Sequence, residues 1–556
     1  MLFRSEYVEL VNRLLSDTTT SLWQFRAETI LVVTIILMLV MRVSDLTRRL
    51  FPTWILCLVG SCAALLVLAP WNHLNDPRQA IFTELLVHDP FTVFFRALLI
   101  FFTILFVILT RLSGIPDEED AADFYTLVLG AILGMCMMAS ANHLLIVFLA
   151  VEMASVPSYV LAGMLKGRRK SSEAALKYSI YGAGAAGVML YGISLIAGVT
   201  GSAHLPTIAA NLAAGAGADS QLVLLLGGLM VMVGLAFKLS AVPFHFWCPD
   251  VFEGASAEVN AFLSVASKAA ALALLVRVAV GLSSVPAAAL LAQDMLAQET
   301  VAQDPVVATQ VVQAMADGSV GDGEARLADI RTLISYVIAV IAAVTCTFGN
   351  LAAYGQTNIK RLLAYSTIAH AGYMMMAVAA GMSLMNTDRA AAQGAFAALL
   401  VYVAIYVFMN LGAFAIVAFL RNTMFSEEID DYRGLVRSSP GVVVCFSAIL
   451  FSLVGLPPLA GFIGKLLIFY RLYEAKMIAL LFIGGINTAI SLFYYLRVVK
   501  VMTLEPEPDD RGPVQFPMIS IPGMYVALVT APILFMVIQW DGLHEWAIAA
   551  CQHVFG

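Results

Sequence analysis

Long apolar segments recur throughout this 556-residue chain, and they constrain its fold more than any other feature. Residues 90–112 and 393–420 are examples in which almost every side chain is apolar. A segment of about 20 such residues can cross the hydrocarbon core of a bilayer as a helix. Only 12% of the residues are charged, against about 25% in an average soluble domain. The pattern therefore predicts an all-α polytopic membrane protein.

We expect about fourteen transmembrane helices. They are predicted near residues 28–45, 53–70, 90–112, 123–140, 143–165, 177–200, 221–242, 257–282, 331–353, 362–382, 393–420, 441–472, 477–500 and 518–540. The chain is accordingly divided into residues 1–122 (an N-terminal extension and helices 1–3), 123–283 (a first repeat), 284–330 (an external insertion), 331–500 (a second repeat) and 501–556 (a linker, the last helix and a tail).

The distribution of basic residues predicts the orientation of these helices. Loops on the side of Lys166-Gly-Arg-Arg-Lys170 carry more Lys and Arg than those on the other side, which is typical of a cytoplasmic face. Both termini are then expected on the outer face. The first 27 residues lack the apolar core and small-residue cleavage site of a signal peptide, so the first span is expected to be retained.

Several classes of function are disfavoured by composition and context. The net charge of −7 argues against a nucleic-acid partner. The 7 cysteines form no CxxC pair, so we expect no metal, haem or disulfide framework. The segment Gly182-Ala-Gly-Ala-Ala-Gly187 fits the GxGxxG pattern, but it lies inside an apolar helix with no preceding strand. We interpret it as a helix-packing surface of small residues, and we expect no dinucleotide cofactor.

One stretch combines a buried charge with a helix break. Lys238 lies late in the predicted seventh helix, and Pro243 and His245 follow it. A charge at the centre of a bilayer costs roughly 2.5–3.5 kcal/mol even on the insertion scale, so it is rarely retained without a use. Proline in a helix interior frees a backbone carbonyl group, which neighbouring groups or water then satisfy.

Other ionisable residues lie within the predicted spans. They are Glu152 in helix 5, Lys177 at the start of helix 6, Lys268 in helix 8, His370 in helix 10 and Lys465 in helix 12. Such residues in a helical bundle most often mark an ion or proton route, and without an Asp/Glu cage the proton is favoured. Alternative interpretations are a snorkelling Lys177, a hydrogen-bonded core His370, and structural roles for Arg96 and Arg277.

The twelfth predicted helix has its own interruption, Gly455-Leu-Pro-Pro458, shortly before Lys465. Two broken helices that lie five helices apart predict a duplicated unit, helices 4–8 and 9–13. Because five is odd, the two units would be inverted with respect to each other, as in many transporters.

Four segments together resemble the antiporter-like subunits of respiratory complex I, and within them the subunit N branch. They are Phe237-Lys-Leu-Ser-Ala-Val-Pro-Phe-His-Phe-Trp-Cys-Pro-Asp250 with the following Val-Phe-Glu-Gly, Ala266-Ser-Lys268, Asn358–Ser366 with His370, and Gly455–Lys465. The resemblance covers roughly residues 85–500. The insertion 284–330 and the long polar N-terminus depart from the family pattern.

The resemblance implies a proton-translocating subunit of NADH:quinone oxidoreductase that performs no redox chemistry itself. Glu152 and Lys238 would form an input pair, Lys268 and His370 a central axis, and Lys465 the terminal residue, while Lys177 matches the family's lysine on helix 6. FMN, iron–sulfur clusters and the quinone site would lie in partner subunits. The implied partners are subunits M, A, J and K and the lipids of a bacterial cytoplasmic membrane.

Two other functions remain open at this point. A cation/proton antiporter or a membrane-bound hydrogenase could use the same helical bundle for a different overall reaction. Alternatively, the chain could be a membrane scaffold whose buried charges only hold the helices in register. Variants in which a charge is neutralised would separate the scaffold from a pump, because only a pump would lose proton transfer.

Overall fold

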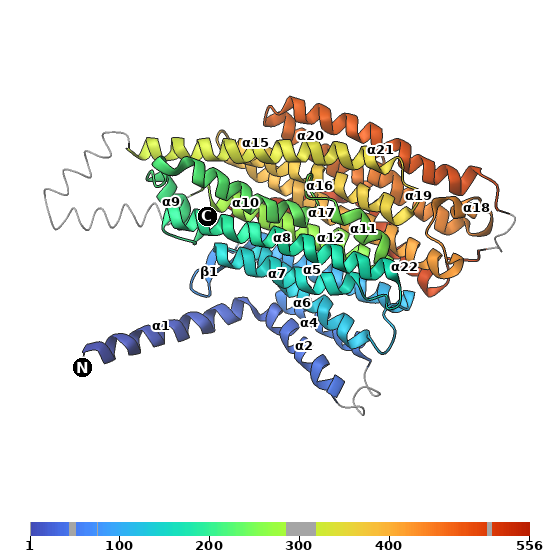
Figure 1. Cartoon of the computed structure of the whole chain (residues 1–556), viewed down its shortest axis with the longest axis horizontal. Helices are drawn as coiled ribbons and strands as arrows, with labels where there is room; N and C mark the ends of the chain where they lie inside the picture. The colour runs from blue at the N-terminus through green and yellow to red at the C-terminus, as the bar shows by residue number, and fades with distance from the viewer. Residues whose placement is uncertain (1, 44–51, 75, 285–318, 509–513, 556) are drawn as a thin grey trace.

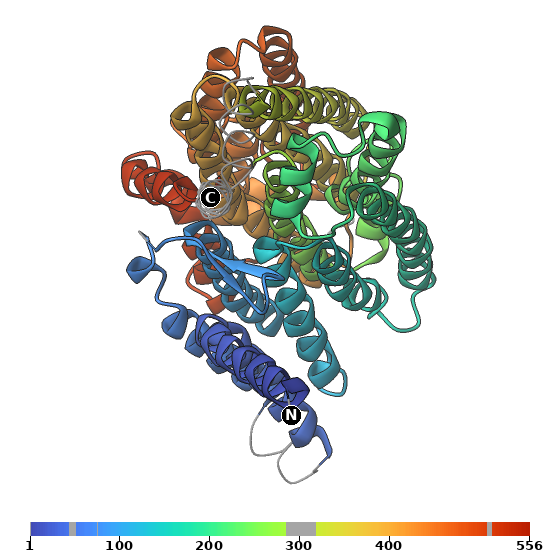
Figure 2. The same ribbon diagram turned by 90° about the vertical axis from the view of Figure 1, so that its left-hand side faces the viewer.

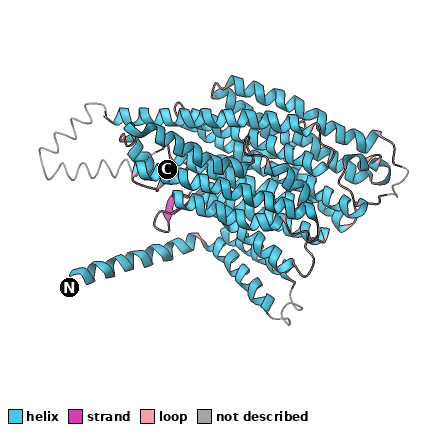
Figure 3. Cartoon of the chain, in the orientation of Figure 1, coloured by secondary structure: helices cyan, strands magenta, loops and turns pink. Residues whose placement is uncertain are grey.

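The computed structural model describes residues 2–43, 52–74, 76–284, 319–508 and 514–555. Almost all of them are helical, and most of the helices lie side by side in one elongated bundle (Figure 1). The β-strands of the described residues form a single short antiparallel hairpin, β1 (Gln79–Ile81) and β2 (Leu86–His88), shown in magenta in Figure 3.

The first half of the described chain contains twelve helical elements besides the hairpin. They are α1 (Leu2–Gln24), α2 (Arg26–Val43), α4 (Thr53–Leu68), η1 (Pro70–Asn72), α5 (Pro90–Ser113), α6 (Ala121–Ser140), α7 (Leu144–Ala162), α8 (Arg169–Thr200), α9 (Leu205–Ala213), η2 (Ala218–Ser220), α10 (Gln221–Leu239) and α11 (Trp247–Gly254).

The remaining elements follow from the middle of the chain to its end. They are α12 (Ala257–Gly281), α15 (Ser319–Ala353), α16 (Ile359–Leu384), α17 (Arg389–Met424), η3 (Ile429–Tyr432), α18 (Leu435–Ser438), α19 (Pro440–Val454), α20 (Ala460–Glu474), α21 (Ile478–Leu504), α22 (Ile521–Phe535) and α23 (Trp540–Cys551). Eleven described helices are long and apolar enough to cross a membrane, or thirteen if each of two bent pairs is one span.

Three helices form the centre of the bundle. Every residue in the most apolar window of α12 is buried, and nearly every residue in those of α16 and α17. By contrast, α4, α8, α15 and α21 bury well under half of theirs, so they lie at the perimeter and expose apolar side chains. Because lipid replaces water around such a bundle, exposed leucines there are expected. Figure 2, viewed roughly along the helices, shows the N-terminal helices at one edge.

The two ends of the bundle differ in the chain segments that they carry. We call one the hairpin end, because it carries the β1–β2 hairpin and α9. We call the other the basic end, because Lys166, Lys170, Lys360 and Arg361 lie there. The central helix α12 runs from the basic end to the hairpin end.

Both predicted helix breaks are present. The seventh predicted helix is divided into α10 and α11 by residues 240–246, and the twelfth into α19 and α20 by residues 455–459. Ser240 and Gly455 both have positive φ, at 57° and 89°, so each ends its helix with a residue in the left-handed region. Broken helices inside a bundle leave free backbone groups where charged residues can bind.

The structure also differs from the expected boundaries. The polar N-terminus forms a helix, α1, that bends by 82° into α2. Residues 319–330 belong to α15, so the second half begins before residue 331, while residues 285–318 of the predicted insertion lie outside the described residues. The predicted last span 518–540 is only α22, and α23 follows it after an 81° bend. A hydrophobicity pattern cannot locate such bends, because it records which residues are apolar and not the angle between successive helices.

Candidate proton-transfer site

Lys238 of α10 and Glu152 of α7 lie within electrostatic range of each other. Lys238 is buried in the last turn of α10, and Glu152 lies half-buried near the middle of α7. Their charges interact, although no ion pair within 4.0 Å joins them among the described residues. The two residues of the predicted input pair are therefore close enough for their charges to interact, but they do not form a direct ion pair.

The backbone groups at the break after α10 are satisfied without Lys238. The indole Nε1 of Trp247 donates to the carbonyl oxygen of Phe237 at 3.1 Å. The N–H of Val242 donates to Oγ1 of Thr345 at 3.0 Å. Lys238 Nζ itself has no hydrogen-bond partner among the described residues. Among the described residues, the electrostatic interaction with Glu152 is therefore the one that compensates the buried charge of Lys238.

Lys268 and His370 lie on the central helices α12 and α16. Lys268 Nζ donates to the carbonyl oxygen of Thr367 at 3.1 Å, and the side chain is almost fully buried. His370 Nδ1 lies 2.6 Å from the hydroxyl of Tyr402, and its Nε2 lies 3.4 Å from that of Tyr495. Imidazole and phenol groups can each donate and accept, so these contacts suit proton transfer.

Lys465 is anchored at the other break. Its Nζ donates to the carbonyl oxygens of Leu453 and Val454, at 3.0 and 2.8 Å, and lies 4.4 Å from the ring centroid of Tyr373. These two carbonyls belong to the last turn of α19, where the helix dipole favours a cation. A Cβ at Gly455 would lie 3.0 Å from Cδ of Lys465, so the break fits closely around the lysine.

The buried groups fall into two sets. Glu152 interacts with Lys238, and His370 lies within electrostatic range of both Lys268 and Lys465. No direct hydrogen bond joins Lys238 to Lys268 in the described part of the chain. Cys248 of α11 lies close to Lys268, so the second half of the broken helix contributes to the surroundings of the second set.

Lys177 belongs to neither set. It binds Glu173 and Asp250, at 2.8 and 2.7 Å, and its side chain is 37% exposed. Arg361 binds Asp250 and Glu253, at 2.9 and 2.7 Å, so these residues form one ion cluster at the basic end. The cluster joins α8, α11 and α16.

We expect Lys177→Met to have a modest effect. Partly exposed ion pairs contribute about 0–1 kcal/mol each, because solvent screens them, and Arg361 still holds Asp250 in the variant. The variant complex should assemble and retain at least half of its quinone-reduction rate, measured in membrane vesicles. A loss as large as that of a buried-lysine variant would instead place Lys177 on the transfer route.

Sequence reasoning missed the burial of Lys360, whereas it included Arg96 within a predicted span. Lys360 precedes the predicted span 362–382, but it lies in the first turn of α16, where it is buried and bound to Glu427 at 2.8 Å. Arg96 is also fully buried, and its Nε lies 2.5 Å from Oε1 of Glu28. The signal was that Asn358 begins a helix as its N-cap, which places Lys360 inside the helix.

Asp89 and Arg277 form a buried ion pair at the hairpin end. Arg277 Nη2 also donates to Thr92 Oγ1 at 2.7 Å, and its Nε donates to the carbonyl oxygen of Ala139 at 2.9 Å. Burial alone would raise the pKa of Asp89, but Arg277 and then Arg78 lower it to about 2. Arg277 thus connects α12 with α5 and α6, as its predicted structural role requires.

His73, Asp76 and His88 come together near the hairpin, and the sequence did not indicate this group. His73 Nδ1 lies 2.6 Å from Oδ2 of Asp76, and His88 Nε2 lies 4.0 Å from the same atom. Arg96 Nη1 lies 3.3 Å from His88 Nδ1 and can only donate to it. Burial and then Arg96 lower the pKa of His88 to about 3. A neutral His88 then directs its Nε2–H toward Asp76, so we assign no metal here.

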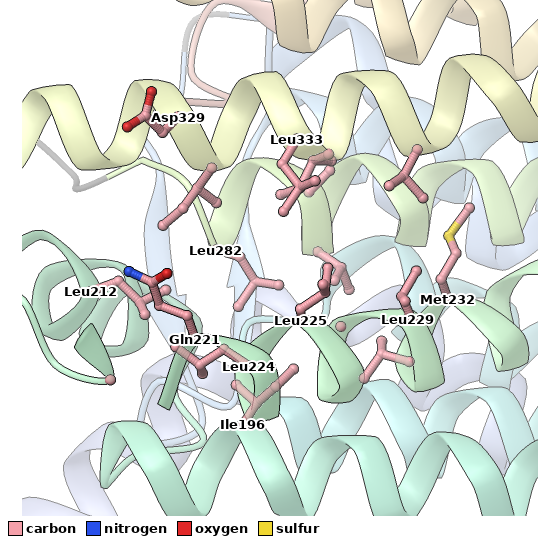
Figure 4. Close-up of a pocket in the computed structure, with 18 of the residues that line it drawn as sticks. Ile196, Leu212, Gln221, Leu224, Leu225, Leu229, Met232, Leu282, Asp329 and Leu333 are labelled. Carbon is pink, nitrogen blue, oxygen red and sulfur yellow. The ribbon is translucent and has the colours of Figure 1, made fainter. Parts of the chain in front are cut away.

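The cavity shown in Figure 4 lies apart from the buried charges. It has a volume of about 730 Å³ and lies between α10, α12 and α15, with Leu225, Leu229 and Leu333 in its wall. Its charged lining residues, Arg326 and Asp329, are both exposed residues of α15. None of the six predicted site residues lines it, so the candidate chemistry is not in this cavity.

Comparison with known proteins decides the family. The membrane family described as NADH:quinone oxidoreductase/Mrp antiporter matches residues 141–293 and 326–491, which include all six predicted site residues. NADH-quinone oxidoreductase subunit N of Anaeromyxobacter sp. (strain Fw109-5) is 38% identical over 553 residues, covering 96% of this chain and 97% of the relative. The chain belongs to the subunit N family.

Chains in solved membrane complexes have a similar fold. A chain of respiratory complex I from Thermus thermophilus is 30% identical, with a TM-score of 0.69 and coverage of 94% of this chain and 99% of that one. A chain of the Mrp complex from Dietzia sp. DQ12-45-1b has the same TM-score at 18% identity, with coverage of 98% and 97%. The latter likeness concerns the fold alone.

Proposed function

We propose that the chain translocates protons in the membrane part of an NADH:quinone oxidoreductase. One observation carries the proposal: a carboxylate, three lysines and a histidine lie within the bundle of a chain from the subunit N family. Ionisable groups in such positions are costly and usually serve transport. Electron transfer through FMN and iron–sulfur clusters, and quinone reduction, take place in partner subunits, so this chain moves protons only.

The proposed route begins at the Glu152–Lys238 pair. Two unit charges 4 Å apart interact by about 4 kcal/mol at an effective dielectric of 20. Moving one charge against 100 mV takes about 2.3 kcal/mol. Forming and separating such a pair therefore provides enough energy to load and release a proton. Since the pair is not closed in this structure, a small change in helix position can alter the interaction.

The second half of the route follows the central helices. A proton released from Lys238 passes to Lys268, then to His370 and its tyrosine neighbours, and finally to Lys465. Electrostatic contact of His370 with both lysines supports this order. The two broken helices, α10–α11 and α19–α20, place a lysine beside each interruption, which supports the proposed inverted repeats of helices 4–8 and 9–13.

The partners and orientation are part of the same proposal. The basic end faces the cytoplasm, because basic loops are retained there, and both termini lie on the outer face of a bacterial cytoplasmic membrane. Subunits M, A, J and K contact this chain in the assembled complex. Membership is tested by a native gel of gently solubilised membranes, in which this chain should migrate with an NADH-oxidising band. Migration apart from such a band would favour an antiporter or a hydrogenase.

The route is tested first at its input. We expect Glu152→Gln to lower coupled quinone reduction and proton uptake severalfold in inverted membrane vesicles, because the variant removes the charge that interacts with Lys238. Glu119→Gln, which changes an exposed carboxylate at the basic end, is the matched control and should behave as wild type. Unchanged proton uptake with reduced assembly would favour the scaffold interpretation instead.

A further inference from the structure

The basic end of the bundle contains a buried carboxyl group that the proposed route does not use. Glu258 lies in the first turn of α12, is fully buried, and has no hydrogen-bond partner for either carboxyl oxygen among the described residues. An unpaired buried carboxylate costs several kcal/mol. A structural role would require a partner that repays this cost, and the described chain provides none by direct contact.

One charged group that interacts with Glu258 connects it with the surface of the basic end. Lys360 is buried at the start of α16 and interacts electrostatically with Glu258. Its Nζ binds Glu427 Oε2 at 2.8 Å and the carbonyl oxygen of Ala255 at 2.8 Å. The side chain of Glu427 is 18% exposed. Glu427, Lys360 and Glu258 therefore form a sequence of charged groups that leads from the surface of the basic end into the interior.

A polar stripe on α17 continues into the bundle. Tyr402, Tyr406 and Asn410 are spaced by four residues, so they lie on one face of the helix, and all three are buried. Tyr402 contacts His370, as described above. The hydroxyl of Tyr406 lies beside Thr367 and Asn410, and neither amide atom of Asn410 has a hydrogen-bond partner of good geometry among the described residues.

The first turns of α12 lie near the polar residues of α17, because the two helices pack against each other. The amide of Asn260 donates to the carbonyl oxygen of Phe252 at 2.6 Å, and the ring of Phe252 lies 5.8 Å from that of Phe414, one turn beyond Asn410. Oδ1 of Asn260 is also without a protein partner in the described residues. Tyr406 lies close to Thr367, whose carbonyl oxygen binds Lys268.

Several unpartnered polar atoms between two charged groups indicate internal water. Buried polar groups are normally hydrogen-bonded, and ordered waters satisfy those that lack protein partners. The unpartnered atoms of Glu258, Asn260 and Asn410 lie on the neighbouring helices α12 and α17, and Tyr406 follows Asn410 toward Thr367 and Lys268. A chain of waters along this interface would satisfy these atoms and could also conduct protons.

We propose that Glu258 carries protons from the Lys360–Glu427 pair to Lys268, as an entry branch separate from the Glu152–Lys238 pair. The inference rests on the proposed function. The carboxylate accepts a proton at the basic end and returns it to the water chain toward Lys268, so only O–H and N–H bonds form and break. Lys268 then becomes the point where two branches meet.

The experiment uses the assembled complex in inverted membrane vesicles. Glu258→Gln retains the size of the side chain but cannot release a proton, and it should lower proton uptake and quinone reduction about three- to tenfold. Glu258→Asp should restore at least half of the rate, since it can be protonated. Glu119→Gln is the matched control for a carboxylate that is exposed at the same end.

The outcomes separate this inference from the function on which it rests. Wild-type proton uptake in Glu258→Gln, with proton uptake lost in Lys268→Met, would refute the Glu258 branch and leave the proposed function intact. Wild-type proton uptake in both variants would refute both the Glu258 branch and the proposed function. If Glu258→Gln lowers the amount of assembled complex, Asn410→Leu is tested in its place. A leucine blocks the water chain without changing the charge of the protein. Wild-type uptake in Asn410→Leu would then overturn the proposal.

Discussion

Replacing Lys268 by methionine is expected to abolish proton uptake and to slow quinone reduction by more than about tenfold, the largest effect expected in this chain. Removing a positioned proton-transfer group typically lowers a rate by 10²–10⁴-fold. Lys268 lies on the most completely buried helix and donates to a single carbonyl oxygen, that of Thr367. No other lysine of the described chain occupies its position between the input pair and His370.

The measurement compares proton uptake with quinone reduction in inverted vesicles, at matched amounts of assembled complex. Methionine is similar to lysine in length and lacks the charge, so packing is largely kept. Lys500→Met serves as the control, because that side chain is 63% exposed. A Lys268→Met complex that pumps at the control rate would contradict the central role of Lys268.

Replacing Asp89 by asparagine is expected to prevent stable assembly. Arg277 and Arg78 both lie near Asp89, and the variant leaves the buried charge of Arg277 without its counter-charge. Breaking a buried ion pair by removing one partner costs about 3–5 kcal/mol. That is a large part of the stability of a typical domain. Little intact complex should remain after solubilisation, as judged by the amount of this chain in the native-gel band.

A second variant distinguishes the effect of an unpaired arginine charge from the effect of changed packing around residue 89. Asp89→Asn combined with Arg277→Met removes both charges of the pair and should recover part of the assembled complex. The pKa of Asp89 is held at about 2, so the pair is intact above the ordinary pKa of an aspartate and weakens only as pH falls toward 2. Wild-type assembly of the single variant at neutral pH would show that Arg277 does not need its partner.

The sequence predicted the bundle well because each span is a long apolar segment with polar ends. The predicted range 257–282 became Ala257–Gly281, and 362–382 became Ile359–Leu384. The two breaks were also predictable, since Pro243 and Pro457–Pro458 cannot continue a helix. The bend between α1 and α2 was not predictable, because neither proline nor glycine marks it.

For the candidate site, the sequence indicated which charges are buried but not how they are paired. Lys177 and Lys238 both lie in predicted helices, yet one is in a surface ion cluster and the other is buried beside Glu152. The difference depends on α11, which turns Asp250 toward Lys177 after the break. Lys360 and Glu258 were missed because they lie at the first turns of helices, where a charge usually remains in water.

The anchoring of α12 has a mechanical consequence. Arg277 attaches its hairpin end to Asp89, Thr92 and the Ala139 carbonyl, whereas Glu258 near its basic end has no direct partner among the described residues. Lys268 lies about midway, roughly 15 Å from Glu258 along the axis. A change in the orientation of the Glu258 carboxyl group therefore breaks no hydrogen bond to a described residue, and the contact of Lys268 with Thr367 can stay in place meanwhile.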